Sequence, residues 1–220
     1  MNGFTRASSA FAHPPADKSG FARAAAGEST FPHGVPQPTV SASIVVFSTI
    51  DGAIRDDRGS CHEARHALDL LTARGIPVVL MSEADAGEVQ ELQRELGIAH
   101  PFICGGGSVL YIPRGYFAEL DGLTAGDDVW EVFAFGVRDP SRAVRLLASL
   151  YSVRGEEILT IGFACDWRDR ALLAAVDVPV VVRTGSTDQE RLVRRLPGAY
   201  VTEACGPAGW SEAVLGSAAV

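Results

Sequence analysis

Short apolar runs and amphipathic stretches alternate along the chain from Ile44 onward. Runs with the length and composition of buried strands lie at 44–48, 77–81, 101–104, 158–162 and 178–182. Helices are predicted by their periodicity at 61–74, 86–97, 139–152, 168–175 and 208–215. Two further β segments, at 109–117 and 129–135, are expected at an edge of the sheet. This order is typical of βαβ units with a parallel sheet.

The run at 44–48 decides the predicted architecture. It reads Ile-Val-Val-Phe-Ser, so side chains on both of its faces are apolar. A strand that is buried on both faces belongs in the interior of a parallel sheet covered by helices. We therefore expect one α/β domain in which this strand is central.

The first 43 residues have a different composition. They are rich in Ala, Pro, Ser and Gly and show no apolar periodicity, which predicts a flexible N-terminal tail ahead of a core domain at 44–220. Isolated aromatic side chains on such a tail can dock into pockets of a protein partner, or they can be incidental features of a leader. The aromatic residues concerned are Phe4, Phe11, Phe21 and Phe31.

Charge and composition exclude several classes of function. The net charge of −8 over 220 residues argues against a nucleic-acid partner, because phosphate-backbone binding needs a basic face. No apolar run approaches the ~20 residues that span a bilayer, so we expect a cytoplasmic protein without a membrane span. The four cysteines are scattered and have no zinc-site spacing, which predicts reduced thiols.

The residues that end the first strand carry a family resemblance. Thr-Ile-Asp-Gly-Ala at 49–53 resembles Asp-x-Asp-Gly-Thr, the first motif of haloacid dehalogenase-type phosphatases. Segments 74–80, 96–103, 111–117 and 206–214 resemble, in the same order, the mannosyl-3-phosphoglycerate phosphatase branch of that superfamily. The resemblance implies a three-layer α/β/α sandwich around a central parallel sheet.

The same resemblance assigns family-equivalent catalytic positions. Thr49 stands where the family has its nucleophilic aspartate, and Asp51 stands at the general acid and base. A threonine hydroxyl attacks only with a base beside it, for which Asp51 is the candidate; otherwise Thr49 is a hydrogen-bonding residue at a strand end. Ser82 matches the phosphate-binding serine or threonine, but it also fits the N-cap of the next helix.

Two further motifs are altered more severely. The family's lysine has no counterpart in the core, because Lys18 is the only lysine in the chain; Arg142 is the available substitute, or else part of a solvated helix face. Cys165 and Asp169 occupy the two aspartate positions of the Mg2+-binding loop. A thiol is a poor Mg2+ ligand, so any metal site would rely on Asp51, Asp166 and Asp169.

The loop and cap expected from the family are also changed. Glycines at 105–107, with Gly106 and Gly107 as candidate phosphate-binding amides, replace the family's Glu-Asn-Gly-Gly loop, although a plain turn explains them as well. Only residues 118–138 stand where relatives insert a cap, so the cap is missing or minimal.

These losses together predict a catalytically inactive phosphatase homologue that acts as a binding, scaffolding or assembly protein and needs no cofactor. The alternative is a Mg2+-dependent phosphomonoester hydrolase that uses Asp51, Ser82 and Asp169. Losing a covalent nucleophile removes several powers of ten in rate, each of which corresponds to ~1.4 kcal/mol of barrier.

Overall fold

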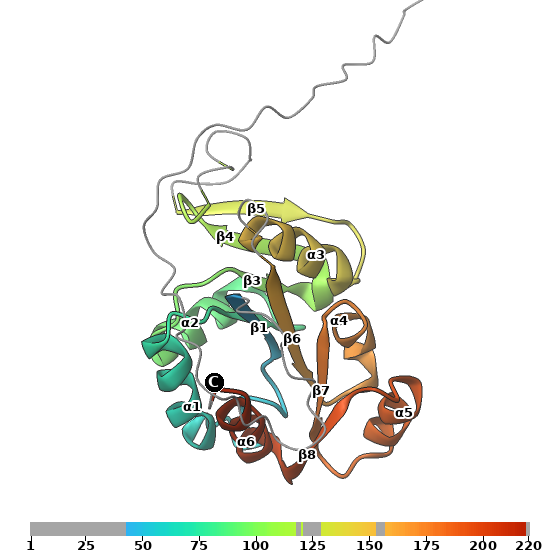
Figure 1. The fold of residues 1–220 in the computed structure, drawn as a ribbon. Coiled ribbons are helices and arrows are strands. Elements are labelled where there is room, and N and C mark those ends of the chain that lie inside the picture. The colour runs from blue at the N-terminus through green and yellow to red at the C-terminus, as the bar shows by residue number, and fades with distance from the viewer. Residues whose placement is uncertain (1–42, 118–119, 121–128, 153–156, 219–220) are drawn as a thin grey trace, which may run out of the picture.

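A single eight-stranded sheet organises the molecule (Figure 1). The computed structural model describes residues 43–117, 120, 129–152 and 157–218. The strands are β1 (Ser43–Thr49), β2 (Val78–Met81), β3 (Phe102–Cys104), β4 (Val109–Pro113), β5 (Trp130–Ala134), β6 (Ile158–Ala164), β7 (Val178–Arg183) and β8 (Tyr200–Cys205). The helices are α1 (His62–Ala73), α2 (Ala86–Leu96), α3 (Pro140–Tyr151), α4 (Arg170–Leu173), α5 (Thr187–Arg195) and α6 (Gly206–Ala218), with 3-10 turns η1 (Gly105–Gly107) and η4 (Trp167–Asp169).

Strand β1 lies in the interior of the sheet, as its sequence predicts. The strand order is β5-β4-β3-β2-β1-β6-β7-β8, and β1 pairs in parallel with both β2 and β6. Among the described strands only β4 runs opposite to the others, and it pairs antiparallel with β3 and β5 at one edge, where the sequence places its two extra β segments. The predicted α/β class and central strand are confirmed.

Helices cover both faces of the sheet and so complete three layers (Figure 1). One core joins Val46, Leu80 and Phe163 to apolar side chains of α1, α2 and α6. The other core joins Phe47 and Val79 to α3, α4 and α5. Alternating residues of β1 thus contribute to opposite cores, which is why all its positions from 44 to 47 are apolar.

A buried hydrogen bond ties the last helix to the central strand. The Trp210 indole N–H on α6 donates to Ser48 Oγ at 3.0 Å, and Ser48 Oγ donates in turn to the Thr49 carbonyl. Trp210 is fully buried and contacts Phe163 with a ring-centroid separation of 5.5 Å. This pairing satisfies two polar groups inside the core and fixes the carboxyl end of β1.

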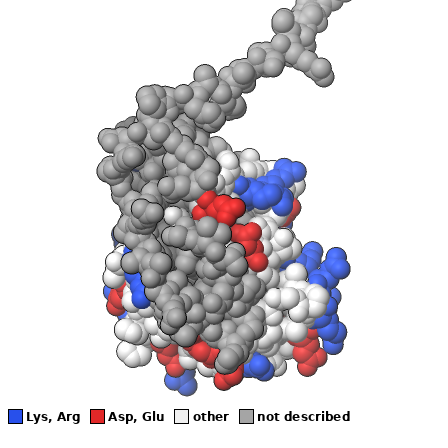
Figure 2. Space-filling view, in the orientation of Figure 1, with Lys and Arg blue, Asp and Glu red and all other residues white. Residues whose placement is uncertain are grey.

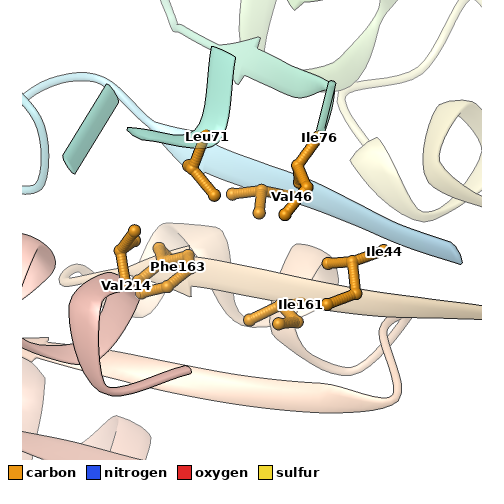
Figure 3. A pocket seen from close by; sticks show the side chains of 7 residues that line it. All are labelled: Ile44, Val46, Leu71, Ile76, Ile161, Phe163 and Val214. Carbon is orange, nitrogen blue, oxygen red and sulfur yellow. The ribbon is translucent and has the colours of Figure 1, made fainter. Parts of the chain in front are cut away.

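A small apolar gap remains between the sheet and α1 and α6 (Figure 3). It is lined by Ile44, Val46, Leu71, Ile76, Ile161, Phe163 and Val214 and has a volume of about 10 Å³. Ligand pockets typically measure about 300–1,000 Å³ and present a few polar groups. The gap is therefore a packing feature of this core and not a binding site.

One strand and one helix of the structure are not predicted by the sequence pattern. Strand β8 has only one fully buried residue, so its sequence contains no continuous apolar run. Helix α5 is mostly charged and buries only Gln189 and Leu192, which leaves no apolar stripe to detect. The helix expected at 168–175 is instead η4 followed by the four-residue α4.

The N-terminal prediction lies almost entirely outside the described residues. Residues 1–42, which include Phe4, Phe11, Phe21 and Phe31, are not described, and Ser43 already belongs to β1. Within the described part of the chain, no helix has both the length and the apolar character needed to cross a membrane.

A partly buried polar chain at the amino end of the sheet gives the first testable prediction. His100 Nδ1 lies 2.8 Å from the Tyr116 hydroxyl, which lies 3.0 Å from the Tyr151 hydroxyl. Burial lowers the pKa of His100 from its usual value of 6.5. Because the unfolded chain then binds the proton at a higher pH than the folded chain, His100 should reduce stability as pH falls below about 6.5.

We expect the contribution of His100 to the free energy of unfolding to drop between pH 7.5 and 5.5, by less than about 1.4 kcal/mol per pH unit. Urea unfolding of the wild type and of His100→Gln at both pH values measures the difference. The pH effect attributed to His100 should vanish in the variant. An equal drop in both proteins would contradict this origin.

Candidate functional site at the carboxyl edge of the sheet

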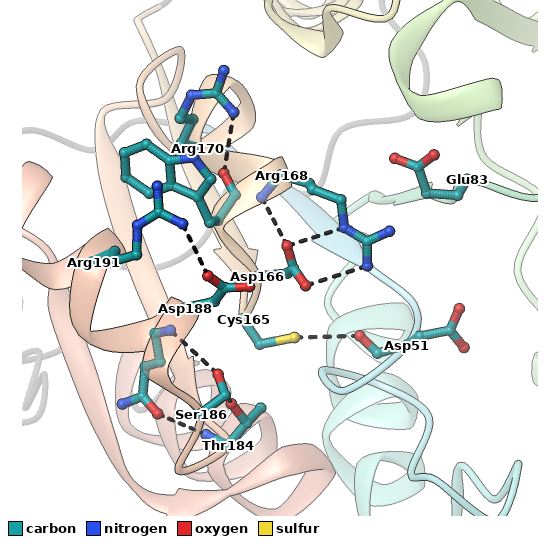
Figure 4. Close-up of polar contacts among 12 residues, drawn as sticks. Asp51, Glu83, Cys165, Asp166, Arg168, Arg170, Thr184, Ser186, Asp188 and Arg191 are labelled. Atoms are coloured by element: carbon teal, nitrogen blue, oxygen red, sulfur yellow. Dashed lines mark hydrogen bonds and ion pairs between the residues drawn. The ribbon is translucent and has the colours of Figure 1, made fainter.

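The carboxyl ends of β1, β2 and β6 meet at one edge of the sheet and carry most of the predicted site residues. Parallel pairing sets Thr49 beside Met81 and Ser48 beside Phe163, so the residues that follow these strands emerge together. The Cys165 thiol donates a 3.4 Å hydrogen bond to the Asp51 carbonyl (Figure 4). The sheet therefore places Thr49, Asp51, Ser82 and Cys165 at the same edge.

The Thr49 side chain is buried and makes no hydrogen bond to a base. Its side chain is 5% exposed, and its hydroxyl has no hydrogen-bond partner in the described structure. Asp51, the expected base, is directed elsewhere, because its carboxylate accepts bonds of 2.9 and 2.6 Å from the Arg55 guanidinium. Neither sequence interpretation of Thr49, as a base-activated nucleophile or as a hydrogen-bonding strand-end residue, matches this geometry.

Ser82 and the glycine turn η1 are bound to each other. Ser82 Oγ accepts from the Ala84 N–H at 3.0 Å, and the Ser82 carbonyl accepts from the Gly106 N–H at 3.1 Å. The Gly106 amide is thus used within the protein and not directed at an anion. The interpretation of Ser82 as a helix N-cap is wrong, because Asp85 caps α2 by accepting from Gly87 and Glu88.

Gly107 has a packing role. Its φ is +97°, and a Cβ at this position would lie 2.3 Å from the Pro140 nitrogen. Only glycine allows η1 to approach the first turn of α3 so closely. Asp139 caps that helix by accepting from the Ser141 N–H, while Arg142 is exposed one turn along it.

An ion pair between Arg138 and Glu83 spans the glycine turn. A Cβ placed on Gly106 would lie 2.9 Å from Arg138 Nε and 3.0 Å from Glu83 Oε1, so both side chains lie directly over the turn. The sequence analysis missed both residues. They are far apart in sequence and belong to no family motif, so no local signal pointed to them.

The loop after β6 carries a second arginine–carboxylate pair. Asp166 accepts from the Arg168 backbone N–H at 2.8 Å and from its guanidinium at 3.1 and 3.2 Å (Figure 4). Burial disfavours the charged form of Asp166, but the hydrogen bonds and charge of Arg168 outweigh it and lower the pKa of this carboxyl. Asp166 is therefore held as an anion by a cation within the chain.

Cys165 and Asp169 lie in a less polar environment. Burial raises the pKa of the Cys165 thiol to about 12, and the nearby carboxylates add to this effect. Burial and the charge of Asp166 raise the pKa of Asp169 to about 6. A neutral thiol and a carboxyl that is easily protonated are both weak ligands for a divalent cation.

Trp167, in the same loop, contacts two arginines. The guanidinium carbons of Arg170 and Arg191 are 5.1 and 4.6 Å from its ring centroid (Figure 4). Figure 2 shows blue side chains gathered at the right of the view, where α5 lies in Figure 1; the last turn of α5 carries Arg194 and Arg195. Cation–π contacts of this kind stabilise the loop and align it with α5.

Three carboxylates at the carboxyl edge are paired with arginines of the same chain. Asp51 pairs with Arg55, Glu83 with Arg138, and Asp166 with Arg168. Among the described residues, no group of three or more His, Cys, Asp or Glu side chains is arranged to hold a metal ion. Asp51, Asp166 and Asp169, the candidate ligands, do not form a joint cluster.

Comparison with known proteins finds both similar sequences and similar folds. The chain is 22% identical to the glucosyl-3-phosphoglycerate/mannosyl-3-phosphoglycerate phosphatase of Methanococcoides burtonii, over 78% of this chain and 96% of that enzyme. The solved structure of yhjK from Bacillus subtilis, a haloacid dehalogenase-like hydrolase protein, has the same fold, with a TM-score of 0.51 at 11% identity and coverage of 76% and 85%. The chain is therefore similar in sequence to this phosphatase and has the fold of a haloacid dehalogenase-like hydrolase.

Other comparisons agree with these similarities. The phosphatase of the same name from Persephonella marina is 34% identical over 74 residues, which span 33% of this chain and 28% of that enzyme. A solved structure from Thermoplasma acidophilum has a TM-score of 0.55 at 12% identity and covers 77% of this chain and 96% of its own. No protein-family model matches this chain.

The close approach of the two loops that follow β1 and β6 gives the second prediction. Gly52 has a φ of +73°, and a Cβ on it would lie 2.7 Å from Cys165 Sγ. Gly52→Ala should therefore lose stability through backbone strain and through overpacking, which costs about 1–3 kcal/mol beyond the strain. Gly59→Ala is the matched control, because Gly59 has a φ of +81° but no neighbour within 4 Å.

Cys165→Ala should restore the overpacking part of the loss, because its Cβ would lie an ordinary 3.9 Å from the new methyl group. Urea unfolding of the two single variants and the double variant measures the coupling. Additive single-variant effects would show that the thiol does not limit this position.

Proposed function

We propose that this protein is a non-catalytic member of the haloacid dehalogenase superfamily that binds another protein and does not hydrolyse phosphate esters. The observation that carries the proposal is the arginine pairing of the carboxylates at the carboxyl edge. Arg55, Arg138 and Arg168 each form an ion pair with a carboxylate there. In a Mg2+-dependent phosphatase the metal ion would have to neutralise these carboxylates instead.

The electrostatics oppose binding of Mg2+ at this edge. Mg2+ takes hard oxygen ligands in near-octahedral geometry and gives up its waters reluctantly, so it needs carboxylates that are free to approach together. Here two neutral groups, Thr49 and Cys165, stand at family carboxylate positions, and the Arg168 guanidinium adds a positive charge beside them. Binding would have to break an existing ion pair.

The geometry also opposes covalent catalysis. A nucleophile needs a base within about 2.6–3.2 Å, and the buried Thr49 hydroxyl contacts none. Asp51 is bound to Arg55 and is largely exposed. These observations support the reading that the family's chemical positions are vestigial.

This chain also has few residues that could correspond to the cap that covers the substrate in the family. The alignment with the Methanococcoides burtonii phosphatase extends over 265 positions, but 78% of this 220-residue chain supplies only about 172 of them. The run at 118–138, where the resemblance places the family's cap, has only 21 residues. This shortness supports a role without enclosure of a sugar phosphate.

A Mg2+-dependent phosphomonoester hydrolase remains the second candidate, and one observation favours it. The pKa of Asp169, raised by burial to about 6, lies in the range in which a carboxyl can both accept and donate a proton near neutral pH. In that case Asp51 and Ser82 would complete the site, and activity would rise as Asp169 ionises above pH 6.

The third prediction separates the two candidates. Purified protein with 10-fold excess Mg2+ over a range of pH should hydrolyse p-nitrophenyl phosphate no faster than Asp51→Asn, because neither protein has a nucleophile. Titration calorimetry should detect no heat of Mg2+ binding. Mg2+-dependent turnover that Asp51→Asn abolishes would establish the second candidate instead.

A restored variant serves as the positive control for this assay. Thr49→Asp combined with Cys165→Asp returns two carboxylates to the family positions, so it should bind Mg2+ measurably in the same calorimeter. Turnover should remain slight, because the core still lacks the family's lysine.

A further inference from the structure

The two helical layers of the described structure carry opposite charges. The layer of α3, η4, α4 and α5 has seven arginines and three acidic residues, whereas the layer of α1, α2 and α6 has two arginines and six acidic residues. Figure 2 shows blue side chains at the right of the view, over the places that α3 and α5 have in Figure 1. A chain with a net charge of −8 therefore presents one layer that attracts anions.

Four exposed arginines of this layer form a cluster with Trp167. The guanidinium carbons of Arg170 on α4 and Arg191 on α5 lie 5.1 and 4.6 Å from the centroid of its ring (Figure 4). Arg191, Arg194 and Arg195 are three and four residues apart, so they share one side of α5. We call these five residues the Arg–Trp cluster.

Two arginines of the Arg–Trp cluster have no carboxylate partner among the described residues. The Arg170 guanidinium donates only to the Trp167 carbonyl, at 3.3 Å. Arg195 is exposed in the last turn of α5 and takes part in none of the ion pairs within the described ranges. Both guanidinium groups can therefore accept a carboxylate without giving one up.

The other two arginines have long, exposed ion pairs. Arg191 lies 3.3 Å from Asp188, and Arg194 lies 3.8 Å from Glu190, with side chains that are 53% and 70% exposed for the two arginines. Pairs of this kind contribute little to stability. A carboxylate from outside would thus replace or share these contacts at little cost.

The chemistry of the cluster favours an acidic peptide segment. A guanidinium forms paired hydrogen bonds with a carboxylate, and stacking on an indole reduces the freedom that the side chain loses on binding. Arg191 and Arg195 are four residues apart on a helix, or ~6 Å along its axis. Alternate residues of an extended segment are ~6.6 Å apart, so acidic residues at alternate positions match this spacing.

Other anionic partners fit the cluster less well. Asp188 and Glu190 lie among the arginines of α5 and interrupt the basic stripe that a continuous phosphate backbone would follow. A second copy of this chain would bring its own net charge of −8, and the acidic residues of its other layer stand on helices and not on an extended segment.

We propose that the Arg–Trp cluster is the docking surface for an extended segment of a separate protein with Glu or Asp at alternate positions. Arg and Trp are enriched among the residues that dominate protein interfaces, in agreement with this role. The inference rests on the proposed function as a protein that binds another protein, and it names the chemistry of that partner.

The test uses the full-length protein and rhodamine-labelled ten-residue peptides. One alternates glutamate with serine, and the other alternates glutamine with serine. Fluorescence anisotropy at low salt should show the glutamate peptide binding at least tenfold more tightly than the glutamine peptide. This preference should shrink as salt is added, because the arginines are exposed.

Arg170→Gln combined with Arg195→Gln should weaken binding of the glutamate peptide at least fivefold. The matched control is Arg65→Gln combined with Arg94→Gln, which removes the same charge from α1 and α2 on the other layer and should change binding less than twofold. If the first double variant does not fold, Arg195→Gln alone replaces it, because this exposed side chain has no partner to lose.

Four results would overturn the proposal. Two are equal binding of the glutamate and glutamine peptides, and equal weakening by the two double variants. The third is tighter binding of a ten-residue oligothymidylate than of the glutamate peptide, since the partner would then be a nucleic acid. The fourth is a dimer in analytical ultracentrifugation that Arg170→Gln with Arg195→Gln dissociates, since the partner would then be a second copy.

The peptide titration and the phosphatase assay can fail separately. Absence of peptide binding together with absence of turnover would remove only this docking surface. Peptide binding together with Mg2+-dependent turnover would remove only the proposed loss of catalysis.

Discussion

Parallel pairing of β1 with β6 is the constraint on which the rest of the site depends. It places the turn at Gly52 against Cys165, with a thiol–carbonyl hydrogen bond of 3.4 Å between the two loops. The Trp210–Ser48 bond holds the same end of β1 from the helical layer. The scaffold that positions family carboxylates is thus intact, although two of the residues it positions are a threonine and a cysteine.

Arginine pairing changes what this scaffold can bind. In a metal-dependent site, carboxylates face one another and a cation relieves their repulsion. Here each of Asp51, Glu83 and Asp166 has its own guanidinium, which offsets part of the repulsion that would favour a metal ion. These pairs are largely exposed, so each contributes little to stability; their effect is on what the edge attracts.

The sequence predicted the interior of the sheet better than its margins. Strand β1 was identifiable because burial on both faces demands continuous apolar residues, whereas β8 and α5 bury too few side chains to leave a pattern. The positions of Thr49, Ser82 and Cys165 followed from strand ends. The pairing of Arg138 with Glu83 did not, because it depends on how η1 packs against α3.

The most direct test of the central claim is to locate a metal in crystals. Mn2+ has ligand preferences close to those of Mg2+ and scatters anomalously, so crystals grown with millimolar Mn2+ would reveal an ion at the carboxyl edge. We expect no anomalous peak within bonding distance of Asp51, Asp166 or Asp169, with the Arg55 and Arg168 pairs unchanged. A peak bonded to two of these carboxylates, with the arginines displaced, would contradict the account.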